Sequence, residues 1–241
     1  MPITHAFTNA KADGSDTSVV RPSDWNAVHE GSSDDPNRWE WRWAPPSALE
    51  STLTGTGSFS NPTVAYATQA QLATGATINS TAGLRLTLDM AGAQVGSAGT
   101  AKVRAFKFIV QFNEIDANTT YRIFVTDEDV TTAPTLTSRH LGVRVDGTTV
   151  RFSTGDHATE QTSDISAFVA AATGYRFTIT FDGTTAKCYV NGTLRATHAT
   201  NVPTVVANIG PVFRAWNTNL AAASKLIVLG TVSAVLDVAA S

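Results

Sequence analysis

The chain has 241 residues, of which 42% are hydrophobic and 15% charged, and its formal net charge is −3. That length and hydrophobic content suffice for a full core, whereas the charged fraction is well below the roughly 25% of an average protein. The negative net charge and the lack of Lys/Arg clusters along the sequence argue against nucleic-acid binding. With no run of 18 apolar residues, no membrane insertion is expected.

The first 46 residues are predicted to form an extended arm. They contain four of the five tryptophans but show no sustained hydrophobic periodicity. A single helical turn is predicted at 23–29, with Ser23 as N-cap, before the turn-forming residues 31–37. Ordering such a segment costs about 1–2 kcal/mol per residue, so the arm needs another surface against which to bury itself. We therefore divide the chain into an arm, 1–46, and a domain, 47–241.

Three tryptophans, Trp39, Trp41 and Trp43, stand at alternate positions just before two prolines. In an extended strand their side chains project from the same face. Burial is predicted, because three exposed indoles exceed the apolar patch that soluble monomers tolerate. The favoured cover is the chain's own domain, with this segment as an extra strand or lid. A contact with a subunit or particle is the second alternative, and ligand stacking the third.

From about residue 50 onward, short strand patterns recur. Apolar residues alternate with polar ones in several segments, and Asp146-Gly147, Asp182-Gly183 and Asn191-Gly192 predict tight hairpin turns between them. The run 226–236 is apolar on both faces, as in a central strand, and 166–172 is the one plausible short helix. This spacing predicts an all-β fold, an antiparallel β-sandwich of the jelly-roll type. The alternating segments are 105–112, 121–125, 141–145, 150–152 and 175–181.

One hairpin in the domain has a recognisable pattern. A strand ends at Asp182-Gly183 and is followed by Tyr189-Val190-Asn191-Gly192. This stretch, 177–198, resembles the concanavalin-A-like and laminin-G-like jelly-roll superfamily, and the resemblance extends loosely over about 58–238. Members are commonly carbohydrate- or protein-binding modules, so the resemblance implies a lectin-like binding domain.

A second resemblance lies in the arm. Lys11-Ala12-Asp13-Gly14 and the stretch 20–27, VRPSDWNA, resemble the N-terminal segment of tailed-bacteriophage virion proteins of the tail-fibre or minor structural type, over roughly 3–30. In such proteins the N-terminus attaches to the particle and the distal domain faces outward. The resemblance and the tryptophan pattern imply that the residues attaching to the virion or to a subunit are Arg21, Trp25, Trp39, Trp41 and Trp43.

Candidate catalytic and metal-binding residues are few. Glu114-Ile115-Asp116 resembles the start of the Glu-Ile-Asp-x-(x)-Glu strand of laminarinase-type hydrolases, but Asn118 or Thr119 occupies the position of the general acid. The five histidines show no metal-ligand spacing, so the chain is expected not to be an enzyme and to have no cofactor. A weak alternative is a Ca²⁺ or ligand loop formed by Asp127, Glu128 and Asp129, for which a solvated turn is the favoured interpretation.

Together these patterns predict a non-enzymatic structural protein of a bacteriophage virion, assembled in the host cytoplasm. The jelly roll is expected to act as a tail-fibre or spike adhesin for a host surface glycan or protein. The alternative is a capsid decoration (cement) protein that stabilises the head through the arm, and a lectin-like module outside any particle is a third possibility. Other virion proteins are the expected partners, and a homo-oligomer, with a homotrimer as the form common among phage surface proteins, is the expected assembly.

Overall fold

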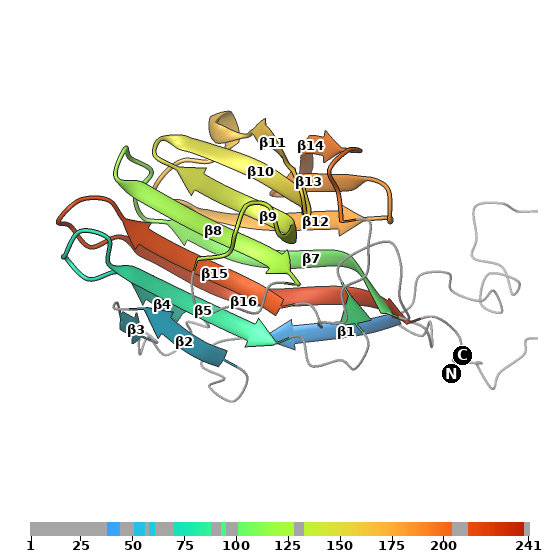
Figure 1. The fold of residues 1–241 in the computed structure, drawn as a ribbon, viewed down its shortest axis with the longest axis horizontal. Helices are drawn as coiled ribbons and strands as arrows, with labels where there is room; N and C mark the ends of the chain where they lie inside the picture. The colour runs from blue at the N-terminus through green and yellow to red at the C-terminus, as the bar shows by residue number, and fades with distance from the viewer. Residues whose placement is uncertain are drawn as a thin grey trace, which may run out of the picture.

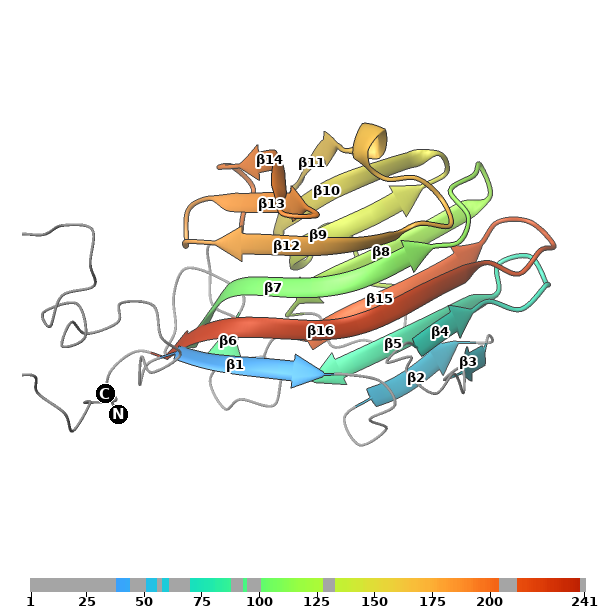
Figure 2. The same ribbon diagram turned by 180° about the vertical axis from the view of Figure 1, so that it is seen from behind.

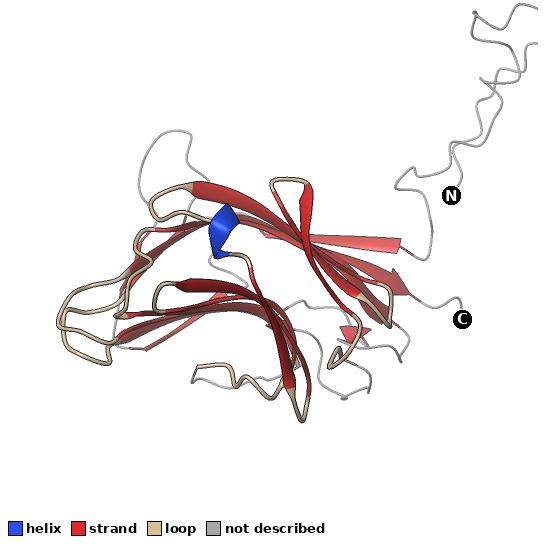
Figure 3. Ribbon diagram, turned by 90° about the horizontal axis from the view of Figure 1, so that it is seen from above, coloured by secondary structure: helices blue, strands red, loops and turns tan. Residues whose placement is uncertain are grey.

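The computed structural model describes residues 38–43, 51–55, 58–60, 70–87, 93–94, 101–127, 133–203 and 212–238. These residues form two β-sheets stacked face to face (Figures 1 and 3). The predicted all-β antiparallel sandwich is confirmed. Within the described part of the chain, no helix is long and apolar enough to cross a membrane.

The nine-stranded sheet lies at the front in Figure 2. Its strand order is β14-β13-β12-β7-β16-β4-β3, with β1 paired to β16 and β6 paired to β7. All pairings are antiparallel except that of β6 with β7. Its strands are β1 (Arg38–Trp43), β3 (Ser58–Ser60), β4 (Ala70–Ala73), β6 (Ala93–Gln94), β7 (Ala101–Phe112), β12 (Gly174–Phe181), β13 (Ala186–Val190), β14 (Thr193–His198) and β16 (Leu226–Val238).

The seven-stranded sheet faces the viewer in Figure 1. Its order is β11-β10-β9-β8-β15-β5-β2, and every neighbouring pair is antiparallel. Its strands are β2 (Ser51–Gly55), β5 (Thr81–Thr87), β8 (Thr119–Thr126), β9 (Arg139–Asp146), β10 (Thr149–Asp156), β11 (Glu160–Asp164) and β15 (Val212–Asn219).

The core fills the space between the sheets with alternate residues of each strand. Phe106, Phe108 and Phe112 of β7 are fully buried, and the Phe108 ring stacks on Phe177 with centroids 5.1 Å apart. Cys188 belongs to the same core, and burial raises the pKa of its thiol to about 12. The period-2 pattern of the sequence therefore places its apolar half inside the sandwich.

The three predicted tight turns connect strands as expected. Gly147, Gly183 and Gly192 all adopt positive φ, at 61°, 102° and 83°, which glycine tolerates without strain. The predicted helix at 166–172 is wrong in length, since only Ser166–Phe168 form a 3-10 turn, η1. The next residue, Val169, is already extended, with φ −136° and ψ 114°, and its side chain is buried.

The last part of the predicted arm contributes a strand to the nine-stranded sheet. The backbone of β1 runs antiparallel to β16, with Trp39 opposite Leu236, Trp41 opposite Ala234 and Trp43 opposite Val232. This is the backbone position expected of an extra strand, although the tryptophan side chains lie outside the described residues. Arg21 and Trp25 also lie outside them, so the attachment residues and the division at residue 46 stay predictions.

Candidate functional site

The first predicted carboxylate of a hydrolase-like motif, Glu114, lies in the loop after β7. Its Oε2 accepts hydrogen bonds from the Tyr121 hydroxyl at 3.1 Å and from the Leu226 backbone N–H at 3.1 Å. Its Oε1 accepts from the Asn113 amide at 2.8 Å. Burial raises the pKa of Tyr121, so that this phenol stays a donor. Glu114 therefore ties the loop to β8 and β16.

The second carboxylate, Asp116, is held in the same loop. It accepts hydrogen bonds from the Lys225 ammonium at 2.5 Å, the Thr119 hydroxyl at 2.9 Å and the Asn118 backbone N–H at 2.9 Å. The Lys225 hydrogen bond is the main cause of the lowered pKa of Asp116. Both carboxylates therefore lie off the strands and stabilise the β7–β8 connection.

The predicted acidic loop is described only at its first residue. Asp127 is buried, and its Oδ2 lies 2.8 Å from Nη1 of Arg139, which neutralises it. Glu128 and Asp129 lie outside the described residues. No group of three or more metal-ligating side chains occurs among the residues that the structure describes. A Ca²⁺ site at this loop stays a prediction.

The outward side of the seven-stranded sheet carries a set of arginines, which we call the arginine face. The seven strands contain six arginines and no lysine. Five of the six alternate with buried core residues and so point away from the core. These five are Arg85, Arg122, Arg144, Arg151 and Arg214.

Strand pairing brings these arginines into direct register. Arg122 lies opposite Arg144, Arg144 lies opposite Arg151, and Arg85 lies opposite Arg214. Like charges directly opposite each other on a sheet are destabilising unless other groups compensate them. The face therefore requires anionic neighbours, either from the chain itself or from a ligand.

The strands supply three carboxylates to this face. Glu160 Oε1 lies 3.0 Å from Nε of Arg144, and Asp146 forms a second ion pair with the same guanidinium. Asp164 is opposite Arg151 in the register. Hydrogen bonds from Ser166 are the main cause of the lowered pKa of Asp164, and the charge of Arg151 adds to the shift. The described strands therefore contribute five arginines and three carboxylates to this face.

Two aromatic rings lie flat on the same sheet. A Cβ added at Gly142 would lie 2.4 Å from the Phe124 ring, and one added at Gly155 would lie 2.6 Å from Nδ1 of His140. The two rings stack with centroids 4.3 Å apart and are fully buried. Because these two glycines have no side chain, the rings can lie against the sheet at these positions.

His140 takes part in a hydrogen-bonded chain across the face. Its Nε2 lies 2.6 Å from the Ser153 hydroxyl, which donates to Glu160 Oε1 at 2.5 Å, and its Nδ1 lies 2.9 Å from the carbonyl of Ser138. Burial lowers the pKa of His140 to about 4. The chain connects the imidazole to the carboxylate that pairs with Arg144.

Residues 133–138, which precede β9, cross part of the arginine face. The Arg122 guanidinium donates to the carbonyl of Pro134, and the carbonyl of Ser138 contacts His140. In Figure 1 residues 133–138 pass in front of the sheet. Arg214 is buried beside Trp216, with its guanidinium carbon 5.9 Å from the ring centroid. The face is thus a partly covered surface that is lined by guanidinium groups.

The sequence prediction missed this face because its arginines are scattered along the chain. A usable signal was the recurring tripeptide in which an arginine separates two core residues, since each one predicts an arginine on the outer side of a strand. The tripeptides are 84–86 (LRL), 121–123 (YRI), 143–145 (VRV), 150–152 (VRF) and 213–215 (FRA). Only strand pairing shows that they meet.

Comparisons with known proteins bear on the fold. No family model matches the sequence, and no curated protein matches it either. Among solved structures, peanut lectin has a TM-score of 0.57 at 10% identity, covering 85% of this chain and 99% of the lectin. A lichenase from a mouse hindgut metagenome has a TM-score of 0.54 at 12% identity, covering 82% of this chain and 98% of the enzyme.

A third similar structure is the endo-beta-1,4-glucuronan lyase from Trichoderma reesei. Its TM-score is 0.55 at 12% identity, over 81% of this chain and 94% of the lyase. The fold is therefore a lectin-like jelly roll that glycan-cleaving enzymes share. The expectation that the chain is not an enzyme is corrected by these comparisons, because a missing motif of one hydrolase type does not exclude the other chemistries found on this fold.

Proposed function

We propose that this chain binds glycans that carry carboxylate groups, through the arginine face. The observation that carries the proposal is the direct register of Arg122, Arg144 and Arg151 across three neighbouring strands. A planar guanidinium matches a carboxylate with two parallel hydrogen bonds, which a lysine cannot do. An acidic sugar chain that lies across these strands offers further carboxylates to the guanidinium groups of this row.

The lectin-like fold supports the same proposal. Peanut lectin, the lichenase and the glucuronan lyase show that glycan-directed proteins use this fold, and binding is the first step for a lectin and an enzyme alike. The proposal therefore concerns recognition of the glycan. Whether the bound glycan is also cleaved is measured in the same experiment.

The test is a calorimetric titration of the full chain with polygalacturonate, which has one carboxylate on each sugar, and with neutral pullulan. We expect binding of polygalacturonate only. The double variant Arg122→Gln/Arg151→Gln should weaken it at least tenfold, because each hydrogen bond to a charged group contributes about 1.5–3 kcal/mol. The matched control is Arg195→Gln, which removes an exposed cation from β14 of the other sheet.

The proposal is wrong if pullulan binds equally well, or if the double variant binds polygalacturonate like the wild type while keeping its thermal unfolding temperature. Product chain lengths from the same mixtures report cleavage. Shortened polygalacturonate with the wild type, and intact polymer with the double variant, would assign both binding and cleavage to the arginine face.

We further propose that a bacteriophage particle carries the chain through its N-terminal segment. The support is the resemblance of residues 3–30 to virion proteins, in which the distal domain faces outward. A glycan-binding domain fits a tail adhesin best, and capsid decoration is the alternative. The proposed partners are other virion proteins and two further copies of the chain, which together form a trimer. Deleting residues 1–37, which leaves β1 intact, should abolish incorporation into particles while the domain still folds.

Undiminished incorporation of the deletion variant would contradict the particle proposal. Copy number separates the two locations, since a decoration protein matches the abundance of the capsid protein whereas a tail adhesin is far rarer.

A further inference from the structure

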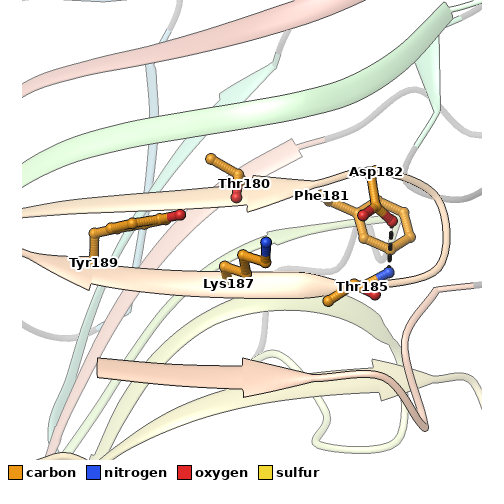
Figure 4. Close-up of a pocket in the computed structure, with 6 residues that line it drawn as sticks. All are labelled: Thr180, Phe181, Asp182, Thr185, Lys187 and Tyr189. Carbon is orange, nitrogen blue, oxygen red and sulfur yellow. Dashed lines mark hydrogen bonds between the residues drawn. The ribbon is translucent and has the colours of Figure 1, made fainter. Parts of the chain in front are cut away.

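The outward side of the nine-stranded sheet has a hollow of its own. Figure 4 shows this hollow over β12 and β13, with a volume of about 390 Å³. It lies on the opposite side of the sandwich from the arginine face, because each sheet turns its other side toward the shared core. The residues that line it are Thr180, Phe181, Asp182, Thr185, Lys187 and Tyr189.

Three hydrogen-bond donors converge in this hollow. In Figure 4 the Thr180 hydroxyl, the Lys187 ammonium group and the Tyr189 hydroxyl are directed toward one another from the two neighbouring strands. All three side chains are half-buried. None of the three side chains forms a hydrogen bond with another described residue. An ammonium group and two hydroxyls that are arranged around one point can all donate to an oxyanion.

The carboxylate that lines the hollow has hydrogen-bond donors of its own. Asp182 Oδ1 accepts backbone N–H hydrogen bonds from Thr184 at 2.8 Å and from Thr185 at 2.7 Å, within its own turn. These hydrogen bonds are the main cause of its lowered pKa, and the charge of Lys187 adds a smaller contribution. Asp182 therefore caps the β12–β13 turn.

Two more hollows continue along the same sheet face, with volumes of about 370 and 280 Å³. Their cations are Lys107 and Arg176, both exposed. Asp182 is the one carboxylate that lines any of these three hollows. Lys107 and Tyr189 are both paired with Thr178, from opposite sides. The cations of all three hollows therefore lie on β12 and on its two neighbours, and we call them the strip.

We propose that this strip is a second binding site, for a glycan that carries phosphate groups and lies across β13, β12 and β7. A tetrahedral phosphate accepts hydrogen bonds from several directions, which fits an ammonium group and two hydroxyls around one point. Lysine recognises phosphate as a point charge, whereas the planar fork of arginine is the better match to a carboxylate. Three hollows on one sheet face fit a polymer with repeated phosphates better than a single ion.

The test uses linear polyphosphate as the probe and the full chain, in calorimetric titrations at two salt concentrations. We expect Lys187→Gln/Tyr189→Phe to weaken binding about tenfold. We expect a similar loss for Lys107→Gln/Arg176→Gln, because each exposed ion pair contributes a factor of about 1.5–5. The control is Arg195→Gln, whose guanidinium lies 3.9 Å from the Phe168 ring and outside the three hollows. This variant should bind like the wild type.

Two results would overturn the second site. In the first, Arg195→Gln weakens polyphosphate binding as much as Lys187→Gln/Tyr189→Phe does, which would show unspecific attraction. In the second, the strip variants weaken polygalacturonate and polyphosphate binding equally, which would show no preference for phosphate.

The two sites fail separately. Arg122→Gln/Arg151→Gln should leave polyphosphate binding unchanged. If the wild type does not bind polygalacturonate, the proposal for the arginine face fails and the proposal for the strip still stands. Conversely, wild-type polyphosphate binding in both strip variants removes the second site alone.

Discussion

The two outward faces of this sandwich come from the same alternation of apolar and polar residues, yet they differ in what covers them. On the seven-stranded sheet, two aromatic rings and residues 133–138 lie over the strands, and carboxylates pair with some of the arginines. On the nine-stranded sheet, Lys107 and Arg176 are exposed, and one carboxylate, held in its own turn, lines the hollows. The period-2 alternation thus determines which side chains point away from the core. The groups that lie over these side chains determine which contacts they make.

The largest expected difference between the faces concerns a single methyl group. At Gly142, an added Cβ would lie 2.1 Å from the backbone oxygen of Ile123, whereas at Gly174 nothing lies within 4 Å. Gly142→Ala should therefore lower the free energy of unfolding by about 3 kcal/mol or more, and Gly174→Ala should change it by less than about 1 kcal/mol. Urea unfolding of both variants measures this, and equal losses would contradict a tightly covered arginine face.

Acidification should affect the arginine face through His140. Its pKa is lowered to about 4 in the folded chain, below its ordinary value near 6.5, so its contribution is complete above pH 6.5 and is lost as the pH falls toward 4. Between pH 7 and pH 5 this loss is about 2 kcal/mol of unfolding free energy.

The variant His140→Asn should remove that part of the pH dependence, and His157→Asn, at an exposed turn position, is the control. If the unfolding free energy of wild type and of His140→Asn changed equally between pH 7 and pH 5, the hydrogen-bonded groups His140, Ser153 and Glu160 would already hold an extra proton at neutral pH.

A smaller contrast is expected between two carboxylates, one on each face. Glu160→Gln removes the negative charge that Arg144 contacts at 3.0 Å, and should cost about 1–2 kcal/mol. Asp182→Asn keeps an acceptor for the exposed β12–β13 turn and should cost about 0.5 kcal/mol or less. Thermal unfolding at constant salt compares them, and a larger loss for Asp182→Asn would reverse the proposed order of the two faces.

The smallest effect should come from the core side of β13. Cys188 is fully buried and its pKa is raised to about 12, whereas Lys187 and Tyr189 beside it point outward. A maleimide reagent at pH 8 should leave the native thiol unmodified for as long as the domain stays folded, and should label it promptly in urea. Rapid labelling of the native chain would show that β13 does not hold this position in the sandwich.

Much of the fold follows from local signals. Asp146-Gly147, Asp182-Gly183 and Asn191-Gly192 correctly predicted three turns, because only a few residue types accept positive φ. The run 226–236 correctly predicted a central strand, since β16 has neighbours on both sides. The pairing of strands that are far apart in sequence, such as β16 with β7, was not predictable, because it depends on contacts that periodicity does not specify.

The candidate sites were harder to predict for the same reason. Glu114 and Asp116 were noticed because only one residue separates them in sequence, yet their hydrogen bonds stabilise a loop. The arginines of the proposed site are separated by up to 129 positions, from Arg85 to Arg214, and meet only through the register of β5, β8, β9, β10 and β15. A motif search weighs neighbours in sequence, whereas a sheet creates neighbours across strands.

A crystal structure of the full chain with a galacturonate oligosaccharide tests the central proposal most directly. We predict that the sugar lies across β8, β9 and β10, with a carboxylate within hydrogen-bond distance of the Arg122 or Arg151 guanidinium. A sugar bound only to the nine-stranded sheet, or none bound at concentrations that saturate the calorimetric signal, would contradict the assignment of glycan recognition to the arginine face.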